Sequence, residues 1–364
     1  MELFSEETRR NPYPLYDLLR ATSPVLRVEQ LGAWVLFGYD AVKRALHDSA
    51  TFSSEVGAVR PEKFEWLLFM DPPRHTALRG IVSRAFTSRA IASLEPRIRE
   101  LSRSLLEGRT ELDIVADYAT PLPMMVIAEM LGLPVEDWPR YARWSESIVN
   151  LGNAISGHGA DAASRAFEDT DREMKDTLAR ELSDQRGDSL LRALVGAGLS
   201  TPDLVRFVQL LLAAGTETTT NTIANAMLCF AEHPDARGGD VECTVEEVLR
   251  FRSPVQTMFR ATTRPVEVEG ITIPAKQFVM ISLGSANRDP RMFVDPHRFD
   301  VARDPNPHIA FGHGIHFCLG APLARLEARI ALADLAPFDA VTTTWTPRTA
   351  FHILGPQALR IRRR

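Results

Sequence analysis

A long apolar segment with helical spacing occupies the middle of the chain. It reads TPDLVRFVQLLLAAGTETTTNTIANAMLCFAEHP, and its apolar side chains recur every three to four residues, which predicts an α-helix. Its N-cap is expected at Thr201 and its end near Pro234. Helical patterns also dominate from Asp40 onward. With 364 residues, 45% of them hydrophobic, the chain can bury a large core, so we expect one mainly α domain over residues 1–364.

Short stretches of β-structure are expected around these helices. Strands are predicted at 25–28 and 34–37, joined around Gly32, and EVEGITIP in the β-rich stretch 255–279 predicts a hairpin. The Pro- and Asp-rich segment 287–308 is long for an ordinary connection, which favours a functional loop. The expected fold class is therefore mainly α with small β-sheets.

Charge and cysteine content argue against several classes of protein. A net charge of −5 and a pI of about 6.0 give no overall attraction to nucleic acid or to an anionic membrane. The chain has 3 cysteines at wide spacing, which disfavours a disulfide framework or a cysteine-rich metal cluster. The N-terminus lacks the apolar core of a secretory signal, and no stretch approaches the roughly 18 apolar residues that cross a bilayer. We expect a cytoplasmic protein that binds neither nucleic acid nor membrane.

One cysteine lies in a glycine-rich segment, FGHGIHFCLG, which the strong helix former APLARLEARIALADL follows. Its glycines free the backbone for unusual conformations and close approach. A helix start just after Cys318 predicts unpaired N–H groups that lower the pKa of the thiol. These residues alone leave three interpretations open: a buried structural cysteine, a catalytic thiolate with His316 nearby, or an axial ligand of haem iron.

Two further patterns carry polar groups in apolar or helical surroundings. In AAGTETTT, Glu217 and Thr218 are costly inside an apolar helix unless they have partners or a task. The Thr218 hydroxyl is expected to bond the Ala214 carbonyl one turn earlier, although a simple threonine kink near a helix end is the alternative. In EEVLR, Glu247 and Arg250 share one helical face, which by itself indicates no more than a surface pair.

Basic residues also lie in otherwise apolar segments. Each is a solvated charge, or together they form a set of donors for two carboxylates of a buried cofactor. They are His75, Arg79, Arg260 and His316.

In this order and at these distances, the patterns resemble those of cytochrome P450s of the soluble bacterial type. FGHGIHFCLG is similar to the family's cysteine loop, AGTETT to its oxygen-activating helix, and DPPRHTALRG to its haem-propionate segment. EEVLR is similar to its Glu-x-x-Arg pair, whose third partner is expected at His297 or Arg298. The resemblance spans nearly the whole chain. It departs before Glu247, where ARGGDVECT is expected to replace most of a connecting helix by a turn.

The resemblance implies a cytochrome P450 fold with haem b between the long central helix and the helix after the cysteine loop. It implies a monooxygenase in which Cys318 is the proximal ligand of the iron, Glu217 relays protons, and Thr218 holds the oxygen species and its water. Glu247 and Arg250 would brace the fold behind the loop. The residues implied to bind the cofactor are His75, Arg79, Ala214, Arg260, Phe311, His316, Cys318 and Gly320.

The resemblance also implies partners. No flavin-binding or iron–sulfur segment is found in the sequence, so electrons are expected from a ferredoxin and its NAD(P)H-dependent reductase, and O₂ is the co-substrate. An expected basic docking face for an acidic ferredoxin consists of Arg74, Arg84, Arg89 and Arg325. A monomer is expected.

The substrate is expected to be hydrophobic and middle-sized, such as a terpenoid, steroid or macrolide. The family pattern places its pocket at Phe69, Leu211, Val255 and Ile353, although an apolar stripe is equally typical of a core. The alternatives are a peroxide-driven enzyme, or one that couples or desaturates its substrate. A haem-binding sensor without turnover and a cysteine hydrolase are the other classes.

Overall fold

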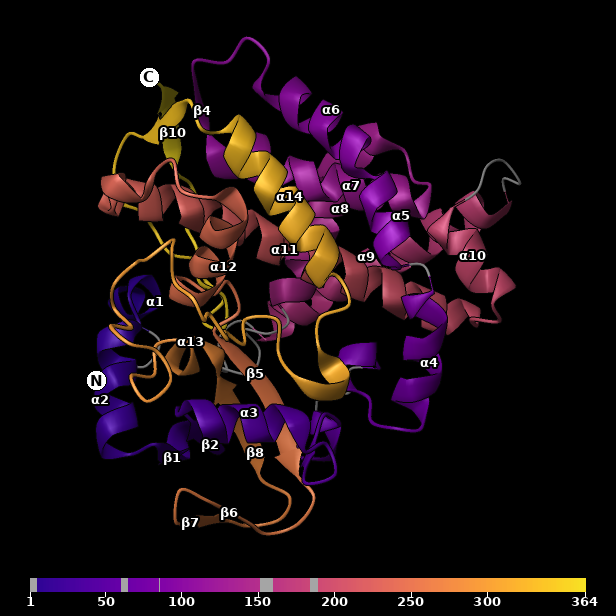
Figure 1. The fold of residues 1–364 in the computed structure, drawn as a ribbon. Helices are drawn as coiled ribbons and strands as arrows, with labels where there is room; N and C mark the ends of the chain where they lie inside the picture. Colours follow the sequence, from indigo (N-terminus) through magenta and orange to yellow (C-terminus); the bar gives the residue numbers. More distant parts are fainter. Residues whose placement is uncertain (1–4, 60–64, 85, 151–159, 184–188) are drawn as a thin grey trace.

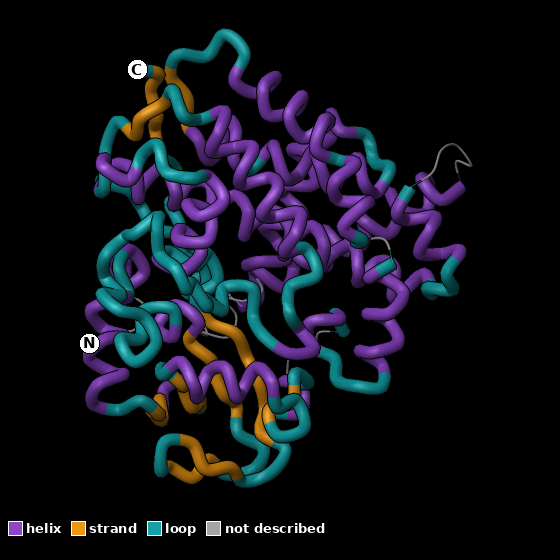
Figure 2. Tube along the Cα trace, viewed as in Figure 1, coloured by secondary structure: helices purple, strands orange, loops and turns teal. Residues whose placement is uncertain are grey.

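The computed structural model describes residues 5–59, 65–84, 86–150, 160–183 and 189–364. Helices make up the larger part of the molecule, and the main sheet lies at one side of it (Figures 1 and 2). This agrees with the expectation of a mainly α protein with small sheets. The helices are α1 (Glu6–Arg10), α2 (Tyr13–Thr22), α3 (Tyr39–His47), α4 (Arg74–Ser83), α5 (Ser88–Ser93), α6 (Glu95–Leu106), α7 (Pro121–Leu131), α8 (Trp138–Asn150), α9 (Ala160–Ser183), α10 (Leu190–Gly196), α11 (Thr201–Glu232), α12 (Val241–Phe251), α13 (Leu283–Ala286) and α14 (Ala321–Asp334).

The strands form sheets of 5, 3 and 2 strands. The largest has the order β1-β2-β8-β5-β3, in which β2 and β8 are parallel and the other pairs are antiparallel. The second has the order β4-β10-β9, and the third is the β6–β7 hairpin. The strands are β1 (Val25–Val28), β2 (Ala33–Leu36), β3 (Phe52–Ser53), β4 (Glu111–Asp113), β5 (Thr257–Thr262), β6 (Val266–Val268), β7 (Ile271–Ile273), β8 (Phe278–Ser282), β9 (Phe338–Ala340) and β10 (Arg360–Arg363).

The expected strands lie within a residue of the observed ones, and the expected hairpin is present. Its turn has positive φ at both Glu269 (50°) and Gly270 (77°), the backbone that two-residue hairpins favour. The segment 287–308 contains no helix or strand, as expected.

The apolar segment forms α11, which packs against α7, α8, α12 and α14 and contributes much of the largest buried cluster. Figure 1 shows α14 crossing in front of it. The predicted N-cap was one residue late: Ser200 has the extended backbone that a cap requires, and its hydroxyl accepts a hydrogen bond from the Asp203 N–H at 3.3 Å. Thr201 is already helical.

The connection before Glu247 is shorter than the turn expected there. A single 3-10 turn, Pro234–Ala236, follows α11, and α12 already begins at Val241. The Asp240 carboxylate caps α12 by accepting the Cys243 N–H at 2.9 Å, so VECT is helix rather than turn.

Among the described residues, no helix is both long enough and apolar enough to cross a membrane.

Candidate active site

The cysteine loop is built from backbone hydrogen bonds and two left-handed glycines. The Cys318 N–H donates to the Phe311 carbonyl at 2.9 Å, which closes the loop on itself. Gly312 and Gly314 have φ of 74° and 73°, a region that L side chains avoid. A Cβ on Gly314 would also lie 2.9 Å from the Leu46 carbonyl oxygen at the end of α3. Gly320 departs from the expectation of unusual backbone, because its φ is an ordinary −82°.

The sulfur of Cys318 lies at the start of α14, as predicted. Gly320 is the N-cap without a side-chain cap, and the N–H groups of Gly320 and Ala321 hydrogen-bond toward the sulfur. The expected fall in thiol pKa is wrong for the protein alone: burial raises the pKa of Cys318, and the two N–H groups and the Arg79 charge oppose that shift without overcoming it. The sulfur therefore lies among N–H donors and beside a cation, all of which favour the thiolate, while burial opposes it.

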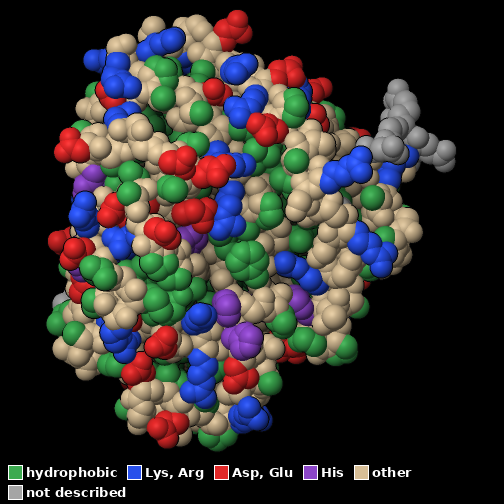
Figure 3. Space-filling view, viewed as in Figure 1, with side chains coloured by type: hydrophobic (Ala, Val, Ile, Leu, Met, Phe, Trp, Pro, Cys, Tyr) green, Lys and Arg blue, Asp and Glu red, His purple; other side chains and the backbone are tan. Residues whose placement is uncertain are grey.

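The structure brings the four predicted basic residues together beside this loop. The rings of His75, on α4, and His316 lie 4.2 Å apart between centroids. The Arg79 guanidinium donates to the Phe317 carbonyl at 2.7 Å, and Arg260 lies on β5 close enough to lower the pKa of His316. Histidine side chains gather over this part of the surface, beside the end of α3 (Figure 3).

Two of the four, His316 and Arg79, already form hydrogen bonds with protein atoms. The Nε2 of His316 lies 2.9 Å from the Ser54 hydroxyl, and its ring also hydrogen-bonds to the backbone of Met70. Burial, with the Arg260, His75 and Arg79 charges, lowers the pKa of His316 to about 3, so the ring is neutral at physiological pH. The positive charge of the cluster thus comes from the arginines.

The other two carry buried polar atoms without partners. Within the described ranges, neither ring nitrogen of His75 has a hydrogen-bond partner, although the residue is 2% exposed. Nη2 of Arg260 is likewise unpartnered, and burial lowers the pKa of this guanidinium to about 10. Orphaned buried donors are rare in folded proteins, so these atoms fit the carboxylates of the haem that the resemblance implies.

The middle of α11 presents a second polar surface. Ala214 is exposed, although buried residues lie on both sides of it in the helix. The Thr218 hydroxyl donates to the Ala214 carbonyl at 2.7 Å, as predicted. Glu217 accepts a hydrogen bond from Asn221 Nδ2 at 3.0 Å, and its Oε1 lies 3.3 Å from Nε of Arg348. The helix thus carries an exposed alanine next to a partly exposed acid and a partly exposed hydroxyl.

The Glu247–Arg250 pair is fully buried and joined by two hydrogen bonds of 2.7 and 2.8 Å. Its third partner is neither of the expected side chains. His297 pairs with Asp17 at 3.2 Å, and Arg298 contributes its carbonyl, which accepts from Arg250 at 3.1 Å.

The side chain that completes this network is Arg303, whose Nε lies 3.3 Å from Glu247 Oε2. It also bonds the Val294, Asp295 and Arg298 carbonyls. The network therefore pins the long loop 287–308 behind the cysteine loop.

The predicted pocket residues fall into two groups. Val255 and Ile353 form an antiparallel bridge. Phe69 stacks on Trp66 with ring centroids 6.1 Å apart, and Leu211 lies on α11 one turn before Gly215. The structure thus pairs two of the four and places the others on separate elements.

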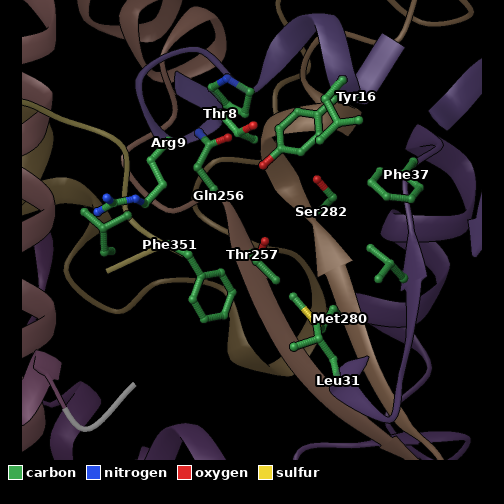
Figure 4. A pocket seen from close by; sticks show the side chains of 14 residues that line it. Thr8, Arg9, Tyr16, Leu31, Phe37, Gln256, Thr257, Met280, Ser282 and Phe351 are labelled. Carbon is green, nitrogen blue, oxygen red and sulfur yellow. The ribbon is translucent and has the colours of Figure 1, made fainter. Parts of the chain in front are cut away.

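Ile353 also lines a cavity between α1, α2, the main sheet and the C-terminal segment (Figure 4). In Figure 4, Arg9 and Phe351 lie on one side of it, and Tyr16 and Phe37 lie on the other. Its volume of about 50 Å³ holds a few waters, and middle-sized ligands need several hundred Å³. This cavity is therefore too small for the expected substrate.

Several residues at the site were not anticipated from the sequence. Ser54 holds His316, Asp71 lies close enough to oppose the fall in the pKa of His75, and Arg348 pairs with Glu217. Asp71 stands within the quoted DPPRHTALRG segment and could have been found there. Ser54 and Arg348 lie in irregular segments with no periodic signal.

Comparisons with known proteins match this chain to one family. A family model described as Cytochrome P450 matches residues 241–336. The chain is 39% identical over 346 residues to a "Putative cytochrome P450 YjiB" of Bacillus subtilis (89% of this chain, 86% of that one). It is also 39% identical over 338 residues to an "Erythromycin C-12 hydroxylase" of Saccharopolyspora erythraea (87% and 84%). The crystal structure of CYP109E1 from Bacillus megaterium in complex with testosterone superposes with a TM-score of 0.90 at 35% identity, covering 99% of both chains.

Proposed function

Because the chain belongs to the cytochrome P450 family, it is an oxidoreductase of the monooxygenase class, and we propose that it hydroxylates a hydrophobic, middle-sized substrate. In this reaction a C–H bond and O₂ become C–OH and water, and two electrons and two protons are consumed. The haem, when bound, supplies the iron-centred redox chemistry. The remaining steps belong to residues of this chain.

The observation that carries the proposal is the buried set of unpartnered donors beside the cysteine loop. His75 and Arg260 supply donors for the carboxylates of haem b, and Arg79 stands near both the cysteine and these donors. Cys318 is the proposed thiolate ligand, with the Gly320 and Ala321 N–H groups turned toward its sulfur. A bound iron would add positive charge at the sulfur and so favour the thiolate over the thiol.

Thr218 and Glu217 are the proposed proton-handling pair. Thr218 is partly exposed one turn after the exposed Ala214 and orients a water there, and Glu217 is partly exposed and passes protons from solvent to it. An assembled acid–hydroxyl pair favours the O₂-dependent reaction over a peroxide-driven enzyme or a haem sensor, since neither of those needs protons delivered in step with O₂ cleavage.

Substrate class and redox partner are proposed on different grounds. Relatives named for erythromycin hydroxylation and a structure with testosterone bound favour a macrolide- or steroid-like molecule. The electrons are proposed to come from a ferredoxin and its reductase. Two of the four expected docking cations have acidic partners: Arg74 pairs with Asp203 at 3.0 Å and Arg325 with Glu246 at 2.7 Å.

The proposal is tested with the purified holoenzyme. The reduced, carbon monoxide-bound protein should show the spectrum of a thiolate-ligated haem, and steroids or macrolides should shift its Soret band. Thr218→Ala should lower product per NAD(P)H about tenfold or more and release hydrogen peroxide, with substrate affinity unchanged.

Thr222→Ala is the matched control, because its hydroxyl makes the same kind of bond, at 2.8 Å, to the Thr218 carbonyl one turn later. Equal coupling in the parent and Thr218→Ala would remove Thr218 from the reaction. A protein without thiolate-ligated haem would overturn the proposal as a whole.

A further inference from the structure

The segment 345–357, which we call the C-terminal loop, folds back on itself between β9 and β10. Pro347 and Pro356 form an antiparallel bridge. The Arg348 N–H donates to the Gly355 carbonyl at 3.0 Å, and the Gln357 N–H donates to the Thr346 carbonyl at 2.8 Å. These bonds make the loop a narrow, defined element.

One edge of this loop lies on α11. Glu217, Asn221 and Asn225 are four residues apart and therefore share one helical face. Asn225 Nδ2 donates to the Leu354 carbonyl at 2.9 Å. A Cβ on Gly355 would lie 1.9 Å from Asn221 Oδ1, so only a glycine allows this approach. Next along the same face, Arg348 reaches the Glu217 carboxylate at 3.3 Å.

The other side of the loop is held by the first helix. Arg9 Nη1 donates to the Arg348 carbonyl at 2.8 Å, and Arg10 Nε donates to the Trp345 carbonyl at 3.0 Å. The backbone of Arg348 is therefore fixed from α1 and from Gly355, and its side chain points to α11.

We propose that Arg348 is a positioning residue for the proton-relaying acid Glu217. The inference rests on the proposed function, because it assigns Arg348 the task of holding that carboxylate. Asn221 Nδ2 donates a hydrogen bond to Oε1, and Nε of Arg348 forms an ion pair with the same oxygen, so that both hold the carboxylate on the side of the C-terminal loop.

The side chains of Arg348 and Glu217 are 23% and 17% exposed, so water screens their attraction less than it screens an exposed pair. The acid keeps one orientation while remaining in reach of solvent. That is the condition for a repeated proton transfer.

The test compares Arg348→Gln, which removes the charge, with Arg348→Lys, which keeps it on a different head group. Arg362→Gln is the matched control, since Arg362 pairs with Glu111 at 2.9 Å in β10, in the same terminal region. We expect Arg348→Gln to lower O₂-dependent product formation about five- to tenfold, with KM unchanged. Turnover driven by added hydrogen peroxide, which brings its own protons, should stay within about twofold of the parent. Arg348→Lys should recover part of the loss.

A second readout does not depend on turnover. Hydrogen–deuterium exchange of the holoenzyme should be faster across residues 345–357 and 217–225 in Arg348→Gln, and unchanged there in Arg362→Gln. Faster exchange with normal O₂-dependent turnover would make Arg348 a structural anchor only and overturn the inference. An equal loss in the O₂- and peroxide-driven assays would do the same.

Failure of the inference can be told apart from failure of the proposed function. If the parent itself lacks a thiolate-haem spectrum or O₂-dependent turnover, the proposed function fails. If the parent is active and Arg348→Gln matches it in both turnover and exchange, the inference alone fails.

Discussion

Glu327 lies on α14, buried against α11, and illustrates how a single residue links stability to pH. It is 1% exposed, and one of its carboxylate oxygens has no partner among the described residues. Burial raises the pKa of Glu327 from 4.5 to about 8, and the Thr219 hydroxyl opposes this shift. The folded protein therefore keeps Glu327 neutral at physiological pH, whereas the unfolded chain ionises it.

This raised pKa predicts a stability that falls with pH. Between about pH 4.5 and 8 the unfolded chain binds fewer protons at this position than the folded one, so the free energy of unfolding decreases as pH rises. Glu327→Gln stays neutral in both states. The free energy of unfolding of this variant, relative to that of the parent, should therefore be higher at pH 8 than at pH 5. Between these two pH values the shift corresponds to a difference of at most about 3.5 kcal/mol.

Urea unfolding of the holoenzyme at the two pH values measures the effect. Glu107→Gln removes an exposed carboxylate and serves as the control for loss of one charge. A stability difference between Glu327→Gln and the parent that is the same at both pH values would contradict the prediction.

At the scale of elements, alanine substitutions at two glycines can separate the steric effect of the contact between the cysteine loop and α3 from the effect of backbone strain. Gly312 and Gly314 have nearly equal φ of 74° and 73°, so alanine at either position carries about 1–2 kcal/mol of backbone strain. A Cβ at Gly312 would meet its nearest atom at 3.7 Å, an ordinary contact, whereas one at Gly314 would lie 2.9 Å from the Leu46 carbonyl oxygen.

Gly314→Ala should therefore destabilise the protein more than Gly312→Ala, by about a further 1–3 kcal/mol. It should also lose thiolate-haem absorbance at a lower urea concentration. Thermal and urea unfolding followed at the Soret band measure both variants, each serving as the other's reference. Equal unfolding midpoints for the two variants would mean that α3 shifts to accommodate the added methyl group.

Elements with periodic patterns were predictable, and elements set by a cap or by distant contacts were not. The helices and strands lay close to their expected positions because hydrophobic period and turn chemistry are local. ARGGDVECT was expected as a turn because the segment is short compared with the family pattern, yet the Asp240 cap starts a helix at VECT. Arg303 and Arg348 escaped prediction because irregular backbone carries no period from which a partner can be inferred.

On the scale of the whole molecule, the site is assembled from segments far apart in the chain. The sequence motifs singled out Cys318, His75, Arg260 and Thr218 one by one, and the family resemblance supplied the roles that we propose for them. What the motifs could not supply was how burial changes each group. It raises the pKa of the Cys318 thiol and leaves His316 neutral, and both effects depend on packing between α4, β5 and the cysteine loop.

The last prediction concerns electron delivery and rests on the charged side chains at the surface around this site. Arg84 and Arg89 are exposed, and no ion pair is found for either within the described parts of the chain. Figure 3 shows cationic side chains over the α4–α5 side of this face, where carboxylates are sparser than on the opposite side. An acidic ferredoxin would be attracted to this side.

The double variant Arg84→Glu/Arg89→Glu should slow reduction by the ferredoxin about tenfold at low ionic strength, with less effect at high salt. Substrate affinity should not change, because neither residue belongs to the proposed pocket. Arg74→Glu is the control on the same face: its charge is already offset by Asp203 at 3.0 Å, so its reversal should slow reduction less. Stopped-flow reduction across a salt series measures all three proteins. A double variant that is reduced as fast as the parent at every salt concentration would show that the ferredoxin docks elsewhere. A decrease in the reduction rate that high salt does not diminish would point to altered packing of α4 and α5 rather than to charge.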